Sequence, residues 1–269
     1  MKENWKNKVV LITGGSSGFG RMIAEGFARR GARIVLAALE KDLLEQATEE
    51  MRGAGSEVLP VLANITKQED VDRIFASVMD HYGQLDVLVN AAGRTHRGRI
   101  EQIPPEDFQA LFDLNVLGTI RCTQAAIPHL LKTKGHVVNI GSLASKSASR
   151  WTGAYPVSKF AVAAFSQQLR LELGPEGIHV LLVCPGPIKR DNPRLYKLPE
   201  GESLPQEALQ PGAGVKVGKI DPVQLTEKII RACEKRKPEL VVPWKARILF
   251  AIAQLFPSLG DWIVRKKTS

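Results

Sequence analysis

The sequence predicts an α/β fold, in which a parallel sheet of about seven strands is covered by helices on both faces. Three observations indicate this class. Apolar runs recur along the chain, amphipathic helical patterns separate them, and a glycine-rich turn joins the first run to the first helical pattern. Strands that alternate with helices form right-handed crossovers, and repeated crossovers build a doubly wound sheet.

The expected elements alternate regularly from the first strand onward. The runs are rich in Val, Ile and Leu, as expected of strands that are buried on both faces. Pro156 fits the first turn of its helix, where a missing N–H costs little. The expected strands are 9–13, 33–38, 57–63, 86–90, 136–142, 178–184 and 239–242, and the expected helices are 19–30, 41–53, 67–82, 105–132, 153–174 and 222–235.

Length and continuity predict a single domain over residues 1–269, with its core at about 6–242. No linker or internal repeat divides the chain. Residues 186–220 are rich in Pro, Gly and Lys and are too long for an ordinary connection, so we expect a substrate-binding loop there. Residues 244–269 form a helical tail with apolar residues between basic ends.

The composition is that of a globular protein, with 44% hydrophobic and 24% charged residues. The three cysteines, Cys122, Cys184 and Cys233, are odd in number and lack CxxC spacing, which predicts structural thiols in a reducing, cytoplasmic compartment. The net charge of +9 attracts anions such as nucleotides. Nucleic acid is disfavoured as a partner, because the basic residues are scattered and aromatics make up only 6%.

No secretory signal or membrane span is expected. Residues 1–8 are polar, and the longest apolar stretch, 248–264, is broken by Gln254, Pro257 and Asp261. That stretch falls short of the roughly 20 apolar residues that cross a bilayer.

The turn between the first strand and the first helix reads TGGSSGFG, residues 13–20. Glycines there let the backbone approach a phosphate closely, and the helix N-terminus offers free N–H groups and a positive dipole end. The spacing Gly14-x-x-x-Gly18-x-Gly20 differs from the commoner GxGxxG fingerprint. The turn predicts a pyrophosphate site, and the alternative is a tight turn without a ligand.

Further motifs follow this turn, each in a suitable structural context. They are Asn90-Ala91-Ala92-Gly93 closing the fourth strand, Asn115, Ser142, Tyr155-x-x-x-Lys159, and Pro185-Gly186 after the sixth strand. With the glycine turn, this series resembles the short-chain dehydrogenase/reductase family over about residues 6–242. The resemblance implies a Rossmann-type fold, a nicotinamide cofactor and an oxidoreductase.

The resemblance also implies which residues contact the cofactor. Two positions depart from the family pattern, since Asn64 stands where an aspartate is usual and Arg190 stands where threonine is frequent. The implied cofactor contacts are Thr13, Gly14, Ser16, Ser17, Gly18, Phe19, Gly20, Ala38, Leu39, Asn64, Ile65, Asn90, Ala91, Ala92, Gly93, Tyr155, Lys159, Pro185, Gly186 and Ile188.

Tyr155 and Lys159 are four residues apart on a predicted helix and therefore share a face. A free tyrosine, with a pKa of about 10, is a poor base at neutral pH, but a nearby ammonium favours the phenolate. Tyr155 is thus the candidate general acid/base, and Ser142 a hydrogen-bond donor to the same substrate oxygen. By resemblance, Lys159 also binds the nicotinamide ribose, and Asn115 holds a water that links Lys159 to solvent.

These four residues also have structural interpretations. Tyr155 and Lys159 would then be surface residues, Ser142 a strand-end cap and Asn115 a locally bonded helix residue. The occurrence of all four residues together, in the family's order, favours the catalytic interpretation. The chemistry needs no metal, and none is expected.

The end of the second strand bears on the choice between NAD and NADP. Ala38 occupies the position where NAD-binding relatives carry an acid, so a 2′-phosphate meets no repulsion there, and NADP(H) is favoured over NAD(H). Leu39 and Ser17 lack the basic groups of many NADP-binding relatives, and Glu40 would reach the ribose if the strand ran further.

The substrate is expected against Ser142 and Tyr155, beneath residues 186–220 and between 94–99 and 143–151. The basic residues in 94–99, with Lys189, Arg190, Arg194 and Lys197, either recognise an anionic group or are solvated loop charges. Residues 244–267 either bind a membrane surface or pack on the protein's own sheet or in an oligomer. By resemblance, the helices at 105–132 and 153–174 form the interface of a homodimer or homotetramer.

The predicted function is an NAD(P)-dependent oxidoreductase that interconverts a small-molecule ketone or aldehyde and an alcohol. One alternative is a catalytically silent NAD(P)-binding redox sensor or scaffold, although such proteins generally lose the Tyr/Lys pair. Another is a nucleotide-sugar epimerase or dehydratase, for which 269 residues leave little room.

Overall fold

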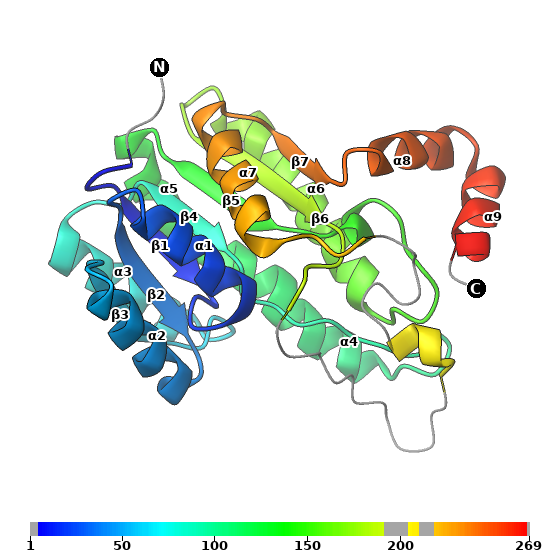
Figure 1. The fold of residues 1–269 in the computed structure, drawn as a ribbon, viewed down its shortest axis with the longest axis horizontal. Coiled ribbons are helices and arrows are strands. Elements are labelled where there is room, and N and C mark those ends of the chain that lie inside the picture. The colour runs from blue at the N-terminus through cyan, green and yellow to red at the C-terminus, as the bar shows by residue number, and fades with distance from the viewer. Residues whose placement is uncertain (1–4, 191–203, 210–217, 268–269) are drawn as a thin grey trace.

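The computed structural model describes residues 5–190, 204–209 and 218–267 (Figure 1). Seven parallel strands form one sheet in the order β3-β2-β1-β4-β5-β6-β7, which confirms the expected fold class. The order reverses between β1 and β4, so the cleft for a ligand opens at the carboxyl ends of these strands. The strands are β1 (Val9–Thr13), β2 (Arg33–Ala38), β3 (Val58–Leu62), β4 (Val87–Asn90), β5 (His136–Ile140), β6 (His179–Pro185) and β7 (Glu239–Val242).

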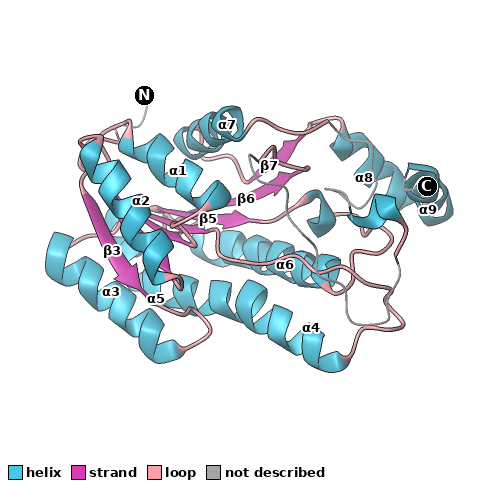
Figure 2. Cartoon of the chain, turned by 60° about the horizontal axis from the view of Figure 1, so that its bottom comes forward, coloured by secondary structure: helices cyan, strands magenta, loops and turns pink. Residues whose placement is uncertain are grey.

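Helices cover both faces of the sheet (Figure 2). In β1, Val10 and Ile12 pack into one apolar cluster, whereas Val9 and Leu11 pack into another on the opposite face. Both faces are therefore buried, which explains why the strands are apolar without alternation. The first cluster includes α1 (Gly18–Ala28), α2 (Lys41–Gly53) and α7 (Pro222–Glu234), and the second includes α3 (Gln68–Tyr82), α5 (Gly118–Thr133) and α6 (Tyr155–Leu173).

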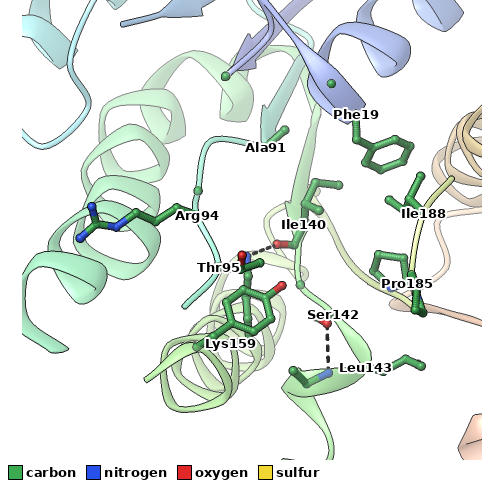
Figure 3. A pocket seen from close by; sticks show the side chains of 18 of the residues that line it. Phe19, Ala91, Arg94, Thr95, Ile140, Ser142, Leu143, Lys159, Pro185 and Ile188 are labelled. Carbon is green, nitrogen blue, oxygen red and sulfur yellow. Dashed lines mark hydrogen bonds between the residues drawn. The ribbon is translucent and has the colours of Figure 1, made fainter. Parts of the chain in front are cut away.

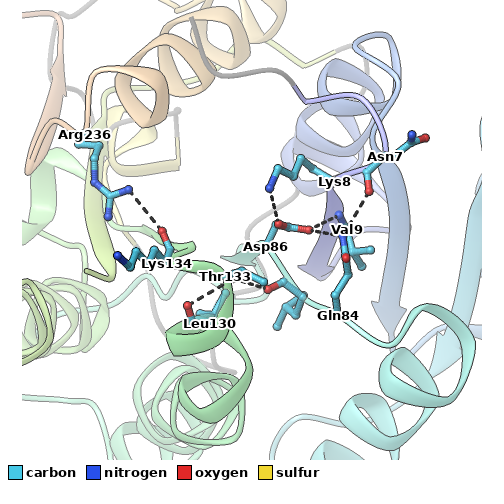
Figure 4. Close-up of polar contacts among 10 residues, drawn as sticks. Asn7, Lys8, Val9, Gln84, Asp86, Leu130, Thr133, Lys134 and Arg236 are labelled. Atoms are coloured by element: carbon cyan, nitrogen blue, oxygen red, sulfur yellow. Dashed lines mark hydrogen bonds and ion pairs between the residues drawn. The ribbon is translucent and has the colours of Figure 1, made fainter. Parts of the chain in front are cut away.

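A buried carboxylate ties the amino ends of the central strands together (Figure 4). Asp86 accepts hydrogen bonds from Val9 N at 2.9 Å, from Lys8 Nζ at 2.8 Å and from Gln84 Nε2 at 3.0 Å. These bonds satisfy a carboxylate that is only 4% exposed. They hold β1 against the start of β4, at the edge of the sheet opposite the cleft.

The prediction of a single helix at 105–132 is wrong, because the segment is divided. The segment consists of α4 (Pro105–Phe112), a π-helical turn η1 (Asp113–Leu117) and α5. A π turn inserts one extra residue per turn into the helical ladder, and such turns are often found at functional sites. Periodicity does not reveal it, because the apolar spacing on either side is ordinary.

The tail is helical, as expected, but it forms two helices. They are α8 (Ala246–Leu255) and α9 (Pro257–Lys267). Phe256 has φ −134° and ψ 78°, because the ring of the following proline disfavours the helical region for the preceding residue. No helix in the described part of the chain is long and apolar enough to cross a membrane.

The predicted substrate loop is described only in part. After β6, Ile188 forms a parallel bridge with Ile220, and Gln206–Leu209 form a short 3₁₀ turn. Arg194 and Lys197 lie outside the described residues. Cys122, Cys184 and Cys233 are buried and form no disulfide bond.

Candidate active site

A cleft of about 1360 Å³ runs across the carboxyl ends of the strands and continues to the tail helices. Its volume exceeds the range of about 300–1,000 Å³ for an ordinary small-molecule pocket, as expected of a site for a dinucleotide and a substrate together. Its wall includes most of the residues predicted to contact the cofactor. These are Gly14, Ser16, Ser17, Gly18, Phe19, Gly20, Ala38, Leu39, Asn64, Ile65, Ala91, Ala92, Gly93, Tyr155, Lys159, Pro185, Gly186 and Ile188.

The glycine turn is packed too tightly for side chains. Gly14 has φ +67°, and a Cβ there would lie 2.8 Å from the Cα of Ala92. A Cβ on Gly20 would lie 2.3 Å from the carbonyl oxygen of Gly14. The N-cap residue of α1, Ser17, makes no side-chain cap, and no acidic residue lies in the first turn. The turn therefore leaves the first amides of α1 for an anion.

Two of the predicted cofactor residues lie behind the cleft wall and hold it in place. Thr13 Oγ1 accepts hydrogen bonds from the backbone N–H groups of Ala91 and Ala92, at 3.2 and 3.3 Å. Asn90 Nδ2 donates to Thr123 Oγ1 and to Asn139 Oδ1. Because both side chains are buried, they position the backbone that lines the cleft and do not reach into it.

Asn115 also lies behind the wall, in the π turn η1. Its Oδ1 accepts a hydrogen bond from Arg94 N, and its Nδ2 donates to Arg94 O and to Ser158 Oγ, all at 3.0–3.1 Å. The amide thus ties η1 to the backbone after β4 and to α6. Asn115 was also interpreted as a residue that bonds locally. Hydrogen bonds of this kind are present, but they connect Asn115 to the backbone of Arg94, in a loop that lines the cleft.

Ser142 follows β5 and caps a 3₁₀ turn, Leu143–Ser145. Its Oγ accepts a hydrogen bond from Ala144 N at 3.1 Å, and Ser145 Oγ accepts one from Ser142 N. This capping box fixes the hydroxyl at the cleft wall. Since one lone pair of the oxygen is engaged, its O–H remains able to donate to a ligand.

Lys159 is almost fully buried beside Tyr155, the first residue of α6. Its Nζ donates to the carbonyl oxygen of Ile140 at 2.7 Å and lies 5.8 Å from the centre of the Tyr155 ring (Figure 3). Burial lowers the pKa of Lys159 to about 8. The ammonium is thus held near the phenol by a main-chain acceptor that no sequence motif identifies.

At the adenosine end, β2 stops at Ala38, so the strand does not run on to Glu40. Glu40 is the N-cap residue of α2 and lines the cleft together with Leu39, which is 62% exposed. Asn64 lines the same end, and its Oδ1 accepts from Thr66 N and Thr66 Oγ1. The amide oxygen of Asn64 is therefore occupied by Thr66.

Beyond Ser142 the cleft wall includes apolar residues that the sequence did not mark, together with polar and basic residues such as Ser149 and Lys245. Leu143 lies beside Ser142, and Leu249 and Phe250 from α8, with Val264 from α9, complete the wall. We expected the tail to bind a membrane surface, to pack on the protein's own sheet or to pack in an oligomer, and Ala246 and Phe250 do pack against the apolar cluster beside β6 and β7. The amphipathic pattern of the tail shows that one face is covered, but it does not indicate that this face borders the active site.

The basic loop at 94–99 does not present its arginines together. The Arg94 side chain points away from Ser142 and Lys159 (Figure 3), whereas Arg97 is buried and donates to the carbonyl oxygens of Ala208 and His96. Arg97 therefore connects this loop to residues 204–209. Arg190 lines the cleft, together with Lys219 and Lys245.

The residues present fit a nicotinamide dinucleotide. The glycine turn is a cradle that a Cβ would fill, its helix N-terminus is free of acidic groups, and the cleft continues past Ala91 and Ile188 to Ser142, Tyr155 and Lys159. A glycine turn of this kind at a helix N-terminus is suited to bind a pyrophosphate.

Comparisons with known proteins agree with this geometry. A family model described as short chain dehydrogenase matches residues 8–196. Over 97% of its length the chain is 33% identical to 11-beta-hydroxysteroid dehydrogenase 1A of Arabidopsis thaliana, of which the match covers 75%. A short-chain dehydrogenase from Streptomyces avermitilis has a similar structure, with a TM-score of 0.80, 30% identity and 98% coverage of both chains.

A fourth comparison concerns the fold alone. A short-chain dehydrogenase/reductase from Burkholderia phymatum, solved in complex with NAD, has a TM-score of 0.83 at 23% identity, with 96% of each chain covered. From the motifs, the cleft and these relatives, the chain belongs to the short-chain dehydrogenase/reductase family of oxidoreductases.

Proposed function

We propose that the protein interconverts a carbonyl compound and the corresponding alcohol. The observation that supports this reaction is the continuity of the cleft from the glycine turn to Ser142, Tyr155 and Lys159. A bound nicotinamide supplies or accepts the hydride, while the protein handles the proton and holds the substrate oxygen.

In the direction of reduction, the Tyr155 hydroxyl donates a proton to the carbonyl oxygen as the carbon gains the hydride. Ser142 donates a hydrogen bond to the same oxygen, where negative charge develops. The Lys159 ammonium stabilises the phenolate that remains. In this proposal Asn115 is a positioning residue, because its amide is occupied by Arg94 and Ser158; a water held nearby as a proton relay remains a prediction.

The test compares Tyr155→Phe with Tyr82→Phe, which makes the same change on α3, outside the cleft. Cofactor oxidation is followed with NADPH and with NADH across ketones and aldehydes, including long-chain and steroid-like members. Turnover by Tyr155→Phe should fall by at least about 100-fold, while its cofactor affinity and the activity of Tyr82→Phe stay near wild type. Near-normal turnover by Tyr155→Phe would refute the mechanism.

The second candidate is a silent NAD(P)-binding sensor or scaffold. It is weaker, because such proteins generally lose the Tyr/Lys pair, whereas this chain holds Lys159 beside Tyr155. Tight cofactor binding without turnover on any carbonyl of the panel would favour this candidate.

We propose NADP(H) as the preferred cofactor. The support is the end of β2 at Ala38, which leaves no carboxylate at the strand end to repel a 2′-phosphate. The opposing feature is Glu40, which lines the same part of the cleft. A ratio of kcat/KM that favours NADH would reverse the preference and make Glu40 the ribose ligand.

We propose an apolar substrate. Leu143, Leu249, Phe250 and Val264 line the end of the cleft beyond Ser142, so a carbonyl compound with a hydrocarbon body would bury its surface there. Within a homologous series of ketones, KM should fall by about fourfold for each added methylene that enters this wall. A preference for short or charged ketones would contradict this substrate class.

We also propose a homodimer or homotetramer that associates through α6 and the neighbouring η1. Val157, Phe160 and Leu171 of α6 and Leu117 of η1 are each more than 40% exposed, and a partner subunit would cover them. Analytical ultracentrifugation of Phe160→Ser against the wild type tests this surface, because the variant should dissociate at higher concentrations.

A further inference from the structure

Exposed apolar side chains gather on the tail helices. Sixteen large hydrophobic residues are exposed in the described part of the chain, and six of them lie within 19 positions. Three of these six are aromatic, and the patch includes two tryptophans. A cluster of this kind marks an interaction surface, whereas single exposed apolar residues do not. We call these residues the tail patch; they are Trp244, Ile248, Leu255, Phe256, Leu259 and Trp262.

The patch lies on and beside a helical hairpin, with Trp244 before α8 and Phe256 between the two helices. Ala246 and Phe250 pack against the apolar cluster beside β6 and β7, while no residue of α8 is fully buried. The two helices approach closely, since a Cβ on Gly260 would lie 2.5 Å from the Cβ of Ala253. Figure 1 shows the pair at the β7 end of the sheet, extending beyond the body of the protein. The inward side is therefore covered and the patch is not.

Basic residues lie near both sequence ends of the patch. Residues 244–267 contain five basic residues and one acidic residue, Asp261. Lys245 is exposed beside Trp244, and Lys266 Nζ lies 5.1 Å from the centre of the Trp262 ring. Arg247 pairs with Glu239 at 3.4 Å. The stretch thus combines exposed apolar side chains with a net positive charge, and Trp244 and Trp262 are its first and last exposed apolar residues.

We propose that α8 and α9 dock on the surface of a membrane that contains anionic lipids. Helices of 10 and 11 residues are too short to span a bilayer, so they lie in the interface with their apolar side chains among the headgroups. The lysines then contact lipid phosphates. A second copy of the chain is a poorer partner, because two such surfaces carry the same positive charge.

This inference is independent of the proposed reaction, and its test needs no substrate. The full chain is sedimented with vesicles of phosphatidylcholine alone or with added phosphatidylserine, at low and high salt. The wild type should bind the anionic vesicles, bind the neutral vesicles much less, and release as salt increases. Binding should also shift tryptophan emission to the blue, as Trp244 and Trp262 leave water.

Two variants and one matched control separate the causes. The triple variant Phe256→Ser, Leu259→Ser, Trp262→Ser should lower the partition coefficient by about 100-fold or more. Lys266→Glu keeps every apolar group and should lower binding to anionic vesicles roughly tenfold. Leu62→Ser is the control, because Leu62 at the far β3 edge is 46% exposed, as is Leu259. Circular dichroism shows whether each variant is folded.

Absence of wild-type binding to anionic vesicles overturns the proposal. Equal binding by the folded triple variant, or by the folded Lys266→Glu variant, also overturns it. If instead the wild type forms an oligomer that dissociates in the triple variant, and neither binds vesicles, the occupant of the tail patch is a second copy.

Discussion

The two ends of the cleft differ in composition: one is lined mainly by backbone atoms and the other mainly by side chains. The cofactor end consists mainly of backbone, at the tips of β1, β2 and β4, with Thr13 and Asn90 fastening it from behind. The substrate end consists largely of side chains, such as Phe250 of α8 and Val264 of α9. No residue of α8 is fully buried. One end is part of the sheet, while the other is attached to its edge.

This difference suggests that different residues determine whether the cofactor binds and which substrate is preferred. A pyrophosphate needs free amides and close approach, which glycines in fixed conformations provide. An apolar substrate needs only shape and hydrocarbon surface, which many side chains provide equally well. Changes at the first end should therefore abolish function, whereas changes at the second should alter preference. The four predictions below test that contrast.

The largest effect is expected for Lys159→Met, which removes the charge and keeps most of the side-chain volume. We expect kcat/KM to fall by about 100- to 10,000-fold, because the phenolate of Tyr155 loses its cation.

The same substitution should increase the free energy of unfolding at neutral pH, because it removes a buried charge. Burial lowers the folded-state pKa of Lys159 to about 8, so between pH 8 and the unfolded value of 10.5 the unfolded chain holds the proton and the folded chain does not.

The free energy of unfolding of the wild type should thus rise with pH across this window, by about 3 kcal/mol from this group. Below pH 8 the full cost of burying the charge is present. Urea titrations at several pH values should show the rise in the wild type and lose it in Lys159→Met. A flat profile in both proteins would show that the ammonium is not desolvated.

Gly20→Ala should weaken cofactor binding by about 100-fold, since its Cβ would lie 2.3 Å from the carbonyl oxygen of Gly14 and force the turn apart. Gly53→Ala is the control, because a Cβ there meets nothing within 4 Å. Calorimetric titration with NADPH and NADH measures both. Wild-type affinity in Gly20→Ala would mean that the turn does not hold the pyrophosphate.

Phe250→Ala tests the substrate end and should raise the KM for a long-chain ketone about tenfold. The cofactor Kd should stay unchanged, because Phe250 lies on α8, away from the glycine turn. Leu255→Ala, on the same helix but 73% exposed, should leave KM unaltered. If Phe250→Ala weakens the cofactor as much as the substrate, the two ends are not independent.

Glu40→Gln should have the smallest effect, a gain of roughly three- to tenfold in affinity for NADPH relative to NADH. Glu40 lines the cleft two residues beyond the end of β2, and its carboxylate would repel a 2′-phosphate that came within reach. Glu49→Gln, on the exposed side of the same helix, serves as the comparison. An unchanged ratio would place Glu40 outside the reach of the ribose.

The contrast also explains what could be predicted from the sequence. Buried parallel strands are continuous apolar runs, so β1 and β2 have the expected bounds. The glycine spacing predicts the cradle because only glycine fits there. Asn115 was identified by its motif, but its π turn and its bonds to Arg94 depend on packing between distant segments.

The substrate end was largely hidden in the sequence. Leu249 and Val264 read as ordinary positions of an amphipathic tail, and nothing in their spacing says which surface they face. The bond from Lys159 to the Ile140 carbonyl involves a main-chain atom, which carries no sequence signature. Contacts of this kind arise from the tertiary fold and become visible only in three dimensions.

The hairpin of α8 and α9 has a consequence for motion. Local opening costs least where few side chains are buried and where the backbone faces solvent. Such an opening would separate Phe250 and Val264 from the cleft while the seven strands and the glycine turn stay folded. Amide hydrogen exchange in the tail should then be much faster than in β1 or β4. One side of the cleft would be rigid, while the side formed by α8 and α9 would open transiently.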